Sequence, residues 1–167
     1  MDNFIHIPGE EPFSENAIAY LDALAHILNK DPRTKNYPDV ATFAFFCRKG
    51  NLLQLKKKCL SENSLRLGRG LVFHITPSNM PVTLAYSLVF GIISGNVNIV
   101  KVSSKKHAQA DIICNAIYEL SKERKHQIFS SRHALISYDA ESSATTYFSS
   151  ICDVRIIWGG NATIDEI

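Results

Sequence analysis

Residues 70–104, GLVFHITPSNMPVTLAYSLVFGIISGNVNIVKVSS, decide the fold of this chain. The apolar run Leu71–Ile75 suits a buried strand, and residues 97–100 form a second apolar run after a Gly-Asn turn. Between them, residues 84–92 place apolar side chains at helical spacing, and Pro81 suits the first turn of that helix. This order of strand, helix and strand predicts a βαβ unit with a parallel sheet.

The alternation continues toward the C-terminus. We expect a helix over 106–122, a strand over Ala134–Tyr138, a helix over Glu141–Ser150 and a strand over Val154–Trp158. Right-handed crossovers bring the carboxyl ends of such strands to one rim, where open α/β sheets bind ligands. The predicted fold class is therefore α/β, with an N-terminal helical segment followed by part of a Rossmann-like parallel sheet.

The N-terminal part is predicted to be mainly helical. One helix covers 14–29 with Ser14 as N-cap, a second covers 39–48 and ends at Gly50, and a third starts at an Asn51 cap and reaches about Leu60. The pattern changes after residue 67. We therefore divide the chain into a helical segment, residues 1–67, and the first part of a dinucleotide-binding α/β domain, residues 68–167.

Composition limits the possible functions. The chain is 46% hydrophobic and 20% charged with a net charge of +2, which is typical of a globular protein without a concentrated basic face and argues against nucleic acid as a partner. The N-terminus does not resemble a signal peptide, and no apolar stretch approaches the ~20 residues of a membrane span. The widely spaced cysteines predict neither a metal site nor a disulfide framework, and fit a cytoplasmic protein.

Asn79 is the first candidate at the predicted rim. It lies in the turn Thr76-Pro77-Ser78-Asn79-Met80-Pro81, which two prolines stiffen. A rigid amide donor at a strand end is what an oxyanion hole requires. An asparagine that closes its own turn through side-chain hydrogen bonds is the alternative.

Lys101 and a pair of glycines follow two other predicted strands. Lys101 can direct its ammonium at a ribose hydroxyl or a phosphate, or lie on the surface, and Ser103 or Ser104 can cap the next helix. The G-x-G-x-x-G fingerprint is missing. The amides of Gly159-Gly160-Asn161 can face a pyrophosphate, or form a turn without a ligand.

No residue of the chain has the context of a nucleophile. Cys47, Cys114 and Cys152 are predicted to be buried structural thiols. His74 and His133 are expected in core or loop positions, and no serine has the setting of a nucleophile elbow.

Three motifs together resemble the aldehyde dehydrogenase superfamily, in particular its acyl-CoA reductase branch. They are GLVFHITPSNMP, SGNVNIVKVSS and CDVRIIWGG, and the resemblance covers residues 68–167. It implies that Asn79 is the oxyanion-hole asparagine and that Lys101 reaches the adenosine ribose. The other positions implied to bind cofactor are Thr76, Pro77, Ser78, Ser103, Ser104, Gly159, Gly160 and Asn161. The later glycine of the family falls near Asp165, where this chain departs from the pattern.

The resemblance also bears on the cofactor. Dehydrogenases of the superfamily commonly carry a glutamate at the position of Ser104, which holds both ribose hydroxyls and repels a 2′-phosphate. Here that charge is missing and Lys105 and Lys106 follow, so we expect NADPH rather than NADH.

The implied function is the N-terminal portion of an NADPH-dependent acyl-CoA reductase that forms an aldehyde through a cysteine acyl-enzyme. We expect the nucleophilic cysteine downstream of this chain, an acyl thioester as substrate, a homo-oligomer at full length and, as in bioluminescence relatives, an acyl-protein synthetase partner. The exposed sheet edge of a half-domain predicts that residues 1–167 alone aggregate or bind a partner. Alternatives are a non-catalytic dinucleotide- or partner-binding module derived from the family, and an unrelated α/β binding domain.

Overall fold

The N-terminal part of the molecule is built from helices. The computed structural model describes residues 7–60, 65–139, 142–160 and 164. Helices α1 (Glu15–Lys30), α2 (Pro38–Phe46) and α3 (Lys49–Cys59) come first, with the 3-10 helix η2 (Pro32–Asn36) between α1 and α2. The Ser14 hydroxyl accepts a hydrogen bond from the Ala17 amide at 3.2 Å and caps α1, which confirms the predicted N-cap.

The C-terminal part alternates strands and helices, as the sequence predicts. The elements are β1 (Leu71–Ile75), α4 (Thr83–Ile93), β2 (Val97–Lys101), α5 (Ala108–Lys122), α6 (Gln127–Ser130), β3 (His133–Ile136), α7 (Ala144–Ile151) and β4 (Val154–Ile157). The described strands form a 4-stranded sheet in the order β3-β2-β1-β4, and each of these pairs is parallel. The α/β fold class with a partial Rossmann-like sheet is confirmed.

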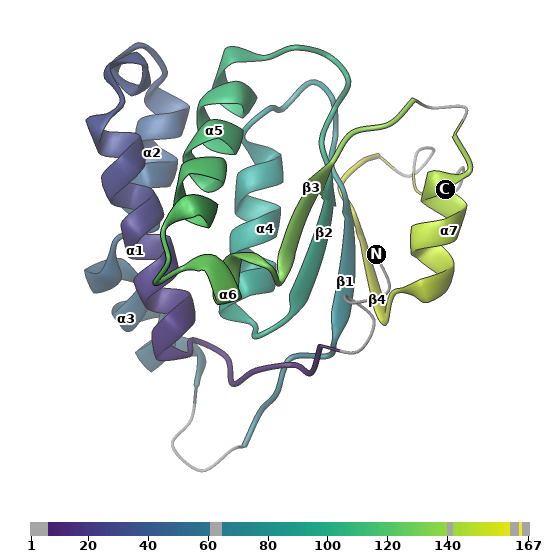
Figure 1. Ribbon diagram of the computed structural model, residues 1–167, viewed down its shortest axis with the longest axis horizontal. Helices are drawn as coiled ribbons and strands as arrows, with labels where there is room; N and C mark the ends of the chain where they lie inside the picture. Colours follow the sequence, from purple (N-terminus) through teal and green to yellow (C-terminus); the bar gives the residue numbers. More distant parts are fainter. Residues whose placement is uncertain (1–6, 61–64, 140–141, 161–163, 165–167) are drawn as a thin grey trace.

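Helices cover both faces of this sheet (Figure 1). Helices α4 and α5 lie on one face with α1, α2 and α3 outside them, and α7 covers the other face. The chain moves outward from β1 through β2 to β3, and then returns to place β4 on the opposite side of β1. The order therefore reverses between β1 and β4, and such a switch point is where open α/β sheets form a ligand crevice.

The larger hydrophobic core joins the N-terminal helices to α4 and α5. Leu21, Leu24 and Leu28 of α1 are fully buried in it, together with Leu88 and Ile113. Burial of one such side chain contributes roughly 1.5–3 kcal/mol. A smaller core lies under α7, where residues of β1 and β2 pack against Phe148. Leu71, Phe73 and Ile75 of β1 thus face the smaller core, whereas His74 faces α4 and contacts Ser87 there.

Asn51 and Pro81 do not have the roles predicted for them at helix starts. Helix α3 begins at Lys49 and contains both Gly50 and Asn51, while the Asn51 amide donates to the Phe46 carbonyl at 2.8 Å. Asn51 therefore satisfies the end of α2 instead of capping α3. Helix α4 begins at Thr83, so Pro81 lies in the preceding turn and not in the first turn of the helix.

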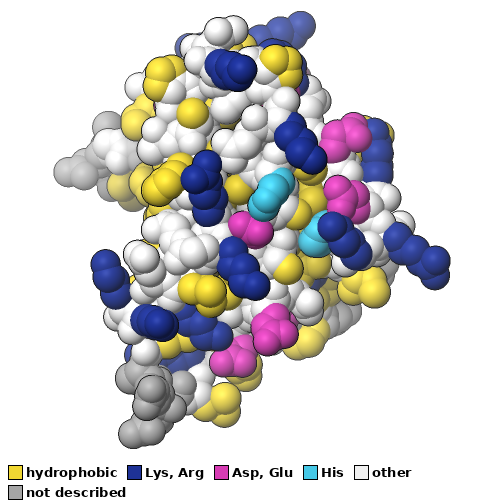
Figure 2. All heavy atoms as spheres, turned by 90° about the vertical axis from the view of Figure 1, so that its left-hand side faces the viewer, with side chains coloured by type: hydrophobic (Ala, Val, Ile, Leu, Met, Phe, Trp, Pro, Cys, Tyr) yellow, Lys and Arg dark blue, Asp and Glu magenta, His cyan; other side chains and the backbone are white. Residues whose placement is uncertain are grey.

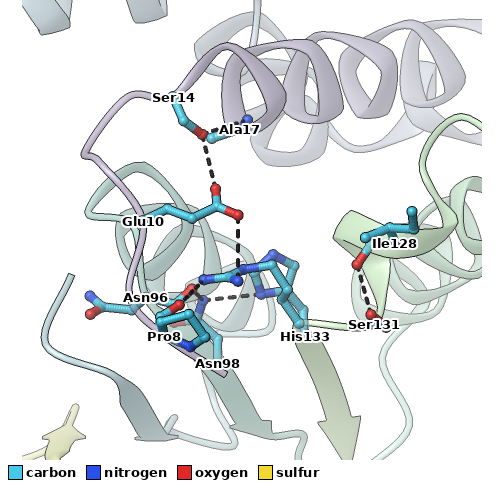
Figure 3. Close-up of polar contacts among 10 residues, drawn as sticks. Pro8, Glu10, Ser14, Ala17, Asn96, Asn98, Ile128, Ser131 and His133 are labelled. Carbon is cyan, nitrogen blue, oxygen red and sulfur yellow. Dashed lines mark hydrogen bonds and ion pairs between the residues drawn. The ribbon is translucent and has the colours of Figure 1, made fainter. Parts of the chain in front are cut away.

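The segment before α1 is tied to the rim opposite the strand carboxyl ends (Figure 3). The Glu10 carboxylate accepts a hydrogen bond from the Ser14 hydroxyl at 3.2 Å and forms an ion pair with Arg132 at 3.4 Å. The Glu10 amide also donates to the carbonyl of Gly95, whose φ of +79° favours glycine. These contacts fix the helical layer relative to the sheet.

Candidate functional site

A pocket of about 470 Å³ opens at the carboxyl ends of the strands, at the switch point between β1 and β4. Its volume lies within the usual range for ligand pockets, roughly 300–1,000 Å³. Its described lining residues are Ile75, Thr76, Pro77, Ser78, Asn79, Lys101, Ser103, Ser104, Tyr138, Trp158, Gly159 and Gly160. The pocket thus brings together every predicted site residue except Asn161, which lies outside the described residues.

The loop after β1 is held in place by contacts with distant segments. The Thr76 hydroxyl donates to the carbonyl of Lys101 at 2.9 Å. The Nε2–H of His107 donates to the carbonyl of Ser78 at 2.8 Å, and a carbonyl can only accept, so Nε2 carries the proton. The loop is therefore tied to the end of β2 and to the start of α5.

Asn79 is exposed and lines the pocket. Its side chain forms no hydrogen bond with another residue that the structure describes, so the predicted alternative, in which Asn79 closes its own turn, is not observed. Its exposed amide group can donate to an oxygen atom placed in the pocket.

Lys101 ends β2, and its ammonium lies over the ring of Tyr138, 4.6 Å from the ring centre. The Tyr138 hydroxyl is 2.9 Å from the hydroxyl of Thr145 on α7. Burial raises the pKa of the Tyr138 phenol, so the phenol is neutral near pH 7. No acidic side chain is among the described residues that line the pocket, so its charge favours an anionic ligand.

The serines after β2 do not cap the following helix. The Ser103 hydroxyl accepts from the amide of Lys105 at 3.1 Å, and His107 is the N-cap residue of α5. Both Ser103 and Ser104 line the pocket instead. The predicted capping alternative is therefore wrong, because the chain makes a separate turn before α5 begins.

The glycines after β4 form the opposite wall of the pocket. Gly159 and Gly160 are exposed, and the Ile164 amide donates to the Gly160 carbonyl at 3.1 Å. A Cβ atom added at Gly160 would meet nothing within 4 Å, so the backbone at this position is open to a ligand. Asp165 lies outside the described residues.

Sequence reasoning missed four residues of this site, of which Ile75, the last residue of β1, also lines the pocket. Tyr138 and Trp158 line the pocket, and His107 holds the loop after β1. Tyr138 and Trp158 each end a predicted strand, so the sequence already indicated that both lie at the rim of the sheet. The contact of His107 with Ser78 joins segments 29 residues apart and had no local signal.

Cys47, Cys114 and Cys152 do not have the environment of a nucleophile. Cys47 is fully buried, and burial raises the pKa of its thiol strongly. Burial also raises the pKa of Cys114 to about 11 and shifts that of Cys152 upward. A raised pKa leaves little reactive thiolate near pH 7, which agrees with the structural role predicted for these residues.

The two histidines of the sheet are also inward-facing. His74 lies in the middle of β1 with no exposed surface, and burial lowers its pKa to about 4. Burial likewise lowers the pKa of His133, at the start of β3, to about 3. Both imidazoles are therefore neutral near pH 7. This agrees with the first of the two predicted alternatives, core or loop positions.

The surface and the remaining side chains add little to the choice of function. On the face shown in Figure 2, Lys and Arg side chains are scattered, with Asp, Glu and hydrophobic groups among them. Among the described residues, no group of three or more His, Cys, Asp or Glu side chains could hold a metal ion. Nor does the described part of the chain contain a helix of the length and apolarity that crossing a membrane requires.

The fold and the pocket define a Rossmann-like α/β protein with a pocket at the switch point of its sheet. A family model described as Acyl-CoA reductase (LuxC) matches residues 9–167, so this chain belongs to that family. The family assignment confirms the resemblance seen in the sequence. It implies acyl-CoA reductase activity for full-length members of the family. No curated protein and no solved structure matches the chain.

Proposed function

We propose that this chain supplies the cofactor-binding part of an NADPH-dependent acyl-CoA reductase, which converts an acyl thioester to an aldehyde. The observation that carries the proposal is the pocket at the switch point, where the loop after β1, the end of β2 and the glycines after β4 meet. The family match supports the reaction class.

The residues around the pocket suit a phosphorylated dinucleotide. Lys101 offers a cation that is not paired with a described acidic side chain, and it can bind a ribose hydroxyl or a phosphate. Ser103 and Ser104 offer hydroxyl groups beside it, and Lys105 follows them. This combination of hydroxyl groups and positive charge favours the additional 2′-phosphate of NADPH.

The opposite wall accommodates the pyrophosphate in this proposal. Gly159 and Gly160 present backbone without side chains, which allows a ligand to approach closely. Thr76, Pro77 and Ser78 form the floor between the two walls, and the contact of His107 with Ser78 keeps that floor in place. When bound, NADPH supplies the hydride that reduces the acyl group.

Asn79 is assigned to the oxyanion hole. Its exposed amide can donate to the carbonyl oxygen of the acyl group as negative charge develops there. We place the nucleophilic thiolate elsewhere in the full-length family protein, because burial raises the pKa of Cys47, Cys114 and Cys152. The exposed Cys59 does not line the pocket. The proposal includes a cytoplasmic location, a homo-oligomer and, as a route of acyl supply, an acyl-protein synthetase partner.

The test is the oxidation of NADPH by the full-length protein with a long-chain acyl-CoA, followed at 340 nm and matched to the aldehyde formed. In Asn79→Ala we expect kcat to fall by about 100- to 1,000-fold, because one oxyanion donor is lost, while the Kd for NADPH changes little. Asn29→Ala, at the exposed end of α1, is the matched control. Binding of NADPH without any reduction by the wild-type protein would instead identify a non-catalytic dinucleotide-binding module.

A further inference from the structure

Trp158 is the sole tryptophan of the sequence and stands at the mouth of the pocket, directly after β4. It is 38% exposed, so one part of the indole faces solvent and the other is held by the protein. Its Nε1–H donates to the hydroxyl of Ser87 on α4 at 2.8 Å. This bond spans 71 residues of sequence and fixes the ring relative to the sheet.

Ser87 is itself held by a buried polar network that consists of Ser87, His74 and Asn98. His74 Nδ1 lies 2.7 Å from the Ser87 hydroxyl, and His74 Nε2 lies 2.9 Å from Asn98 Oδ1. All three side chains are at most 1% exposed. Buried polar groups of this kind rigidify their surroundings when each has its partner.

The donor and acceptor of each hydrogen bond in the network can be assigned by starting from the side chain of Asn98. The Asn98 amide nitrogen donates to the carbonyl of Asn96 at 2.9 Å and lies 3.1 Å from His133 Nδ1. Figure 3 shows Asn98 beside His133. Asn98 Oδ1 must then accept from Nε2–H of His74, which leaves His74 Nδ1 to accept from the Ser87 hydroxyl. The Ser87 oxygen therefore accepts from the indole of Trp158.

Helix α4 makes room for this network at Gly91. A Cβ atom at this position would collide with the side-chain amide of Asn98 and would press against His74 Nε2. Glycine in the interior of a helix costs about 1 kcal/mol relative to alanine. The close approach of α4 to the sheet gives the physical reason for its presence here.

We propose that Trp158 is a cofactor-contacting residue whose exposed ring face packs against the bound dinucleotide, and that Ser87, His74 and Asn98 position it. This inference rests on the proposed function and adds a residue to its site. The indole lies beside the open backbone of Gly159, where a planar heterocycle or a ribose can reach it. Aromatic faces bind such groups by stacking, and a ring that is already fixed loses little freedom on binding.

The experiment measures how strongly acrylamide quenches the fluorescence of Trp158, with and without NADP⁺. The fluorescence of Trp158 is obtained by subtracting the signal of Trp158→Phe from that of the wild-type protein. NADP⁺ is used because, unlike NADPH, it does not absorb the emitted light, and excitation at the red edge of the tryptophan band avoids its adenine absorption. We expect bound NADP⁺ to shield Trp158 from acrylamide. We also expect Trp158→Ala to weaken NADP⁺ binding by about 5- to 100-fold in calorimetry, the range of an aromatic stacking contact.

Ser87→Ala tests the positioning network, and Ser94→Ala at the exposed end of the same helix is its matched control. Ser87→Ala should leave the ring in place but free to turn. We expect stronger quenching of Trp158 and NADP⁺ binding weaker by about threefold or more, a fraction of the full stacking effect. Ser94→Ala should resemble the wild type. A purely structural role for Ser87 would lower the Tm without changing the quenching of Trp158.

Two results would overturn the inference while leaving the proposed function intact. One is NADP⁺ binding that does not shield Trp158 and that Trp158→Ala does not weaken. The other is a Ser87→Ala variant with wild-type quenching and wild-type affinity, which removes the positioning role. A wild-type protein that binds neither NADP⁺ nor NADPH overturns the inference and the proposed function together.

Discussion

The ammonium of Lys101 lies 4.6 Å from the centre of the Tyr138 ring, so the residue that ends β2 is held by one that follows β3. We predict that Lys101→Met weakens NADPH binding by about 10-fold or more, because a hydrogen bond to a charged group is worth about 1.5–3 kcal/mol. Calorimetric titration with NADPH measures this. Lys122→Met is the matched control, since Lys122 lies over Tyr118 at 4.2 Å outside the pocket. Equal losses in both variants would contradict a role for Lys101 in binding.

The cofactor preference depends on the charge at the position of Ser104. Ser104→Glu places a carboxylate in the pocket, where it repels a 2′-phosphate and can accept hydrogen bonds from both hydroxyls of an NADH ribose. We predict that the ratio of kcat/KM for NADPH to that for NADH falls by about 10-fold or more, the effect of one lost or reversed charge contact. Ser143→Glu, at the exposed start of α7, makes the same change of charge as a control. An unchanged ratio in Ser104→Glu would show that this position does not select the cofactor.

His74 makes the stability of the protein dependent on pH. Burial lowers its pKa to about 4, whereas an unfolded histidine has a pKa of about 6.5. The unfolded state therefore binds more protons between these values, and stability is fully present above pH 6.5 and is lost as the pH falls toward 4. The loss is of the order of 3 kcal/mol.

The corresponding measurement is urea unfolding of wild-type protein and His74→Gln at pH 7 and at pH 4.5. The variant is expected to be less stable at pH 7 and to lose less of its stability on acidification, although His133, whose pKa is about 3, still contributes in both proteins. His26→Gln is the control, because its side chain is 69% exposed. The prediction fails if wild-type protein and His74→Gln lose the same stability between the two pH values.

Gly50 and Gly91 both lie within helices and should respond in opposite ways to alanine. Gly91→Ala forces a methyl group into Asn98, so we predict a loss of about 1–3 kcal/mol, as for other overpacked cores. Gly50→Ala meets nothing within 4 Å and should gain up to about 1 kcal/mol of helix propensity. Urea unfolding of the two variants gives the difference directly. A stabilised Gly91→Ala would show that α4 moves away from the sheet at little cost.

Reactivity with a thiol reagent checks the assignment of the cysteines. Cys59 is exposed and should react first in the native protein, whereas Cys47 should react only on unfolding. Because no described thiol is assigned as the nucleophile, Cys114→Ala and Cys152→Ala should keep reductase activity within about threefold of the wild type, the spread expected of a modest structural change. A loss of acyl-enzyme formation in either variant would identify the nucleophile and refute that assignment.

Much of the fold could be predicted because local pattern and burial agree along this chain. The run Leu71–Ile75 forms a strand in which every residue is buried, and the stripe of Leu21, Leu24 and Leu28 faces the core. Helix boundaries were predicted wrongly where a residue suited to capping has another partner. Asn51 has the side chain of an N-cap residue, but it bonds the carbonyl of Phe46 instead. The division at residue 67 remains a prediction.

The sequence by itself determined the alternation of strands and helices and the residues that follow each strand, among them Asn79, Lys101 and Gly159. The spacing of hydrophobic residues predicts where each strand and helix begins and ends, because it reflects which face of each element is buried. Only the tertiary structure decided that β4 lies beside β1, which brings Gly159 to the loop of Thr76. It also decided that Ser87 holds Trp158, from 71 residues away. The pairing of strands depends on how both faces of the sheet are covered together, and no local stretch of sequence contains that information.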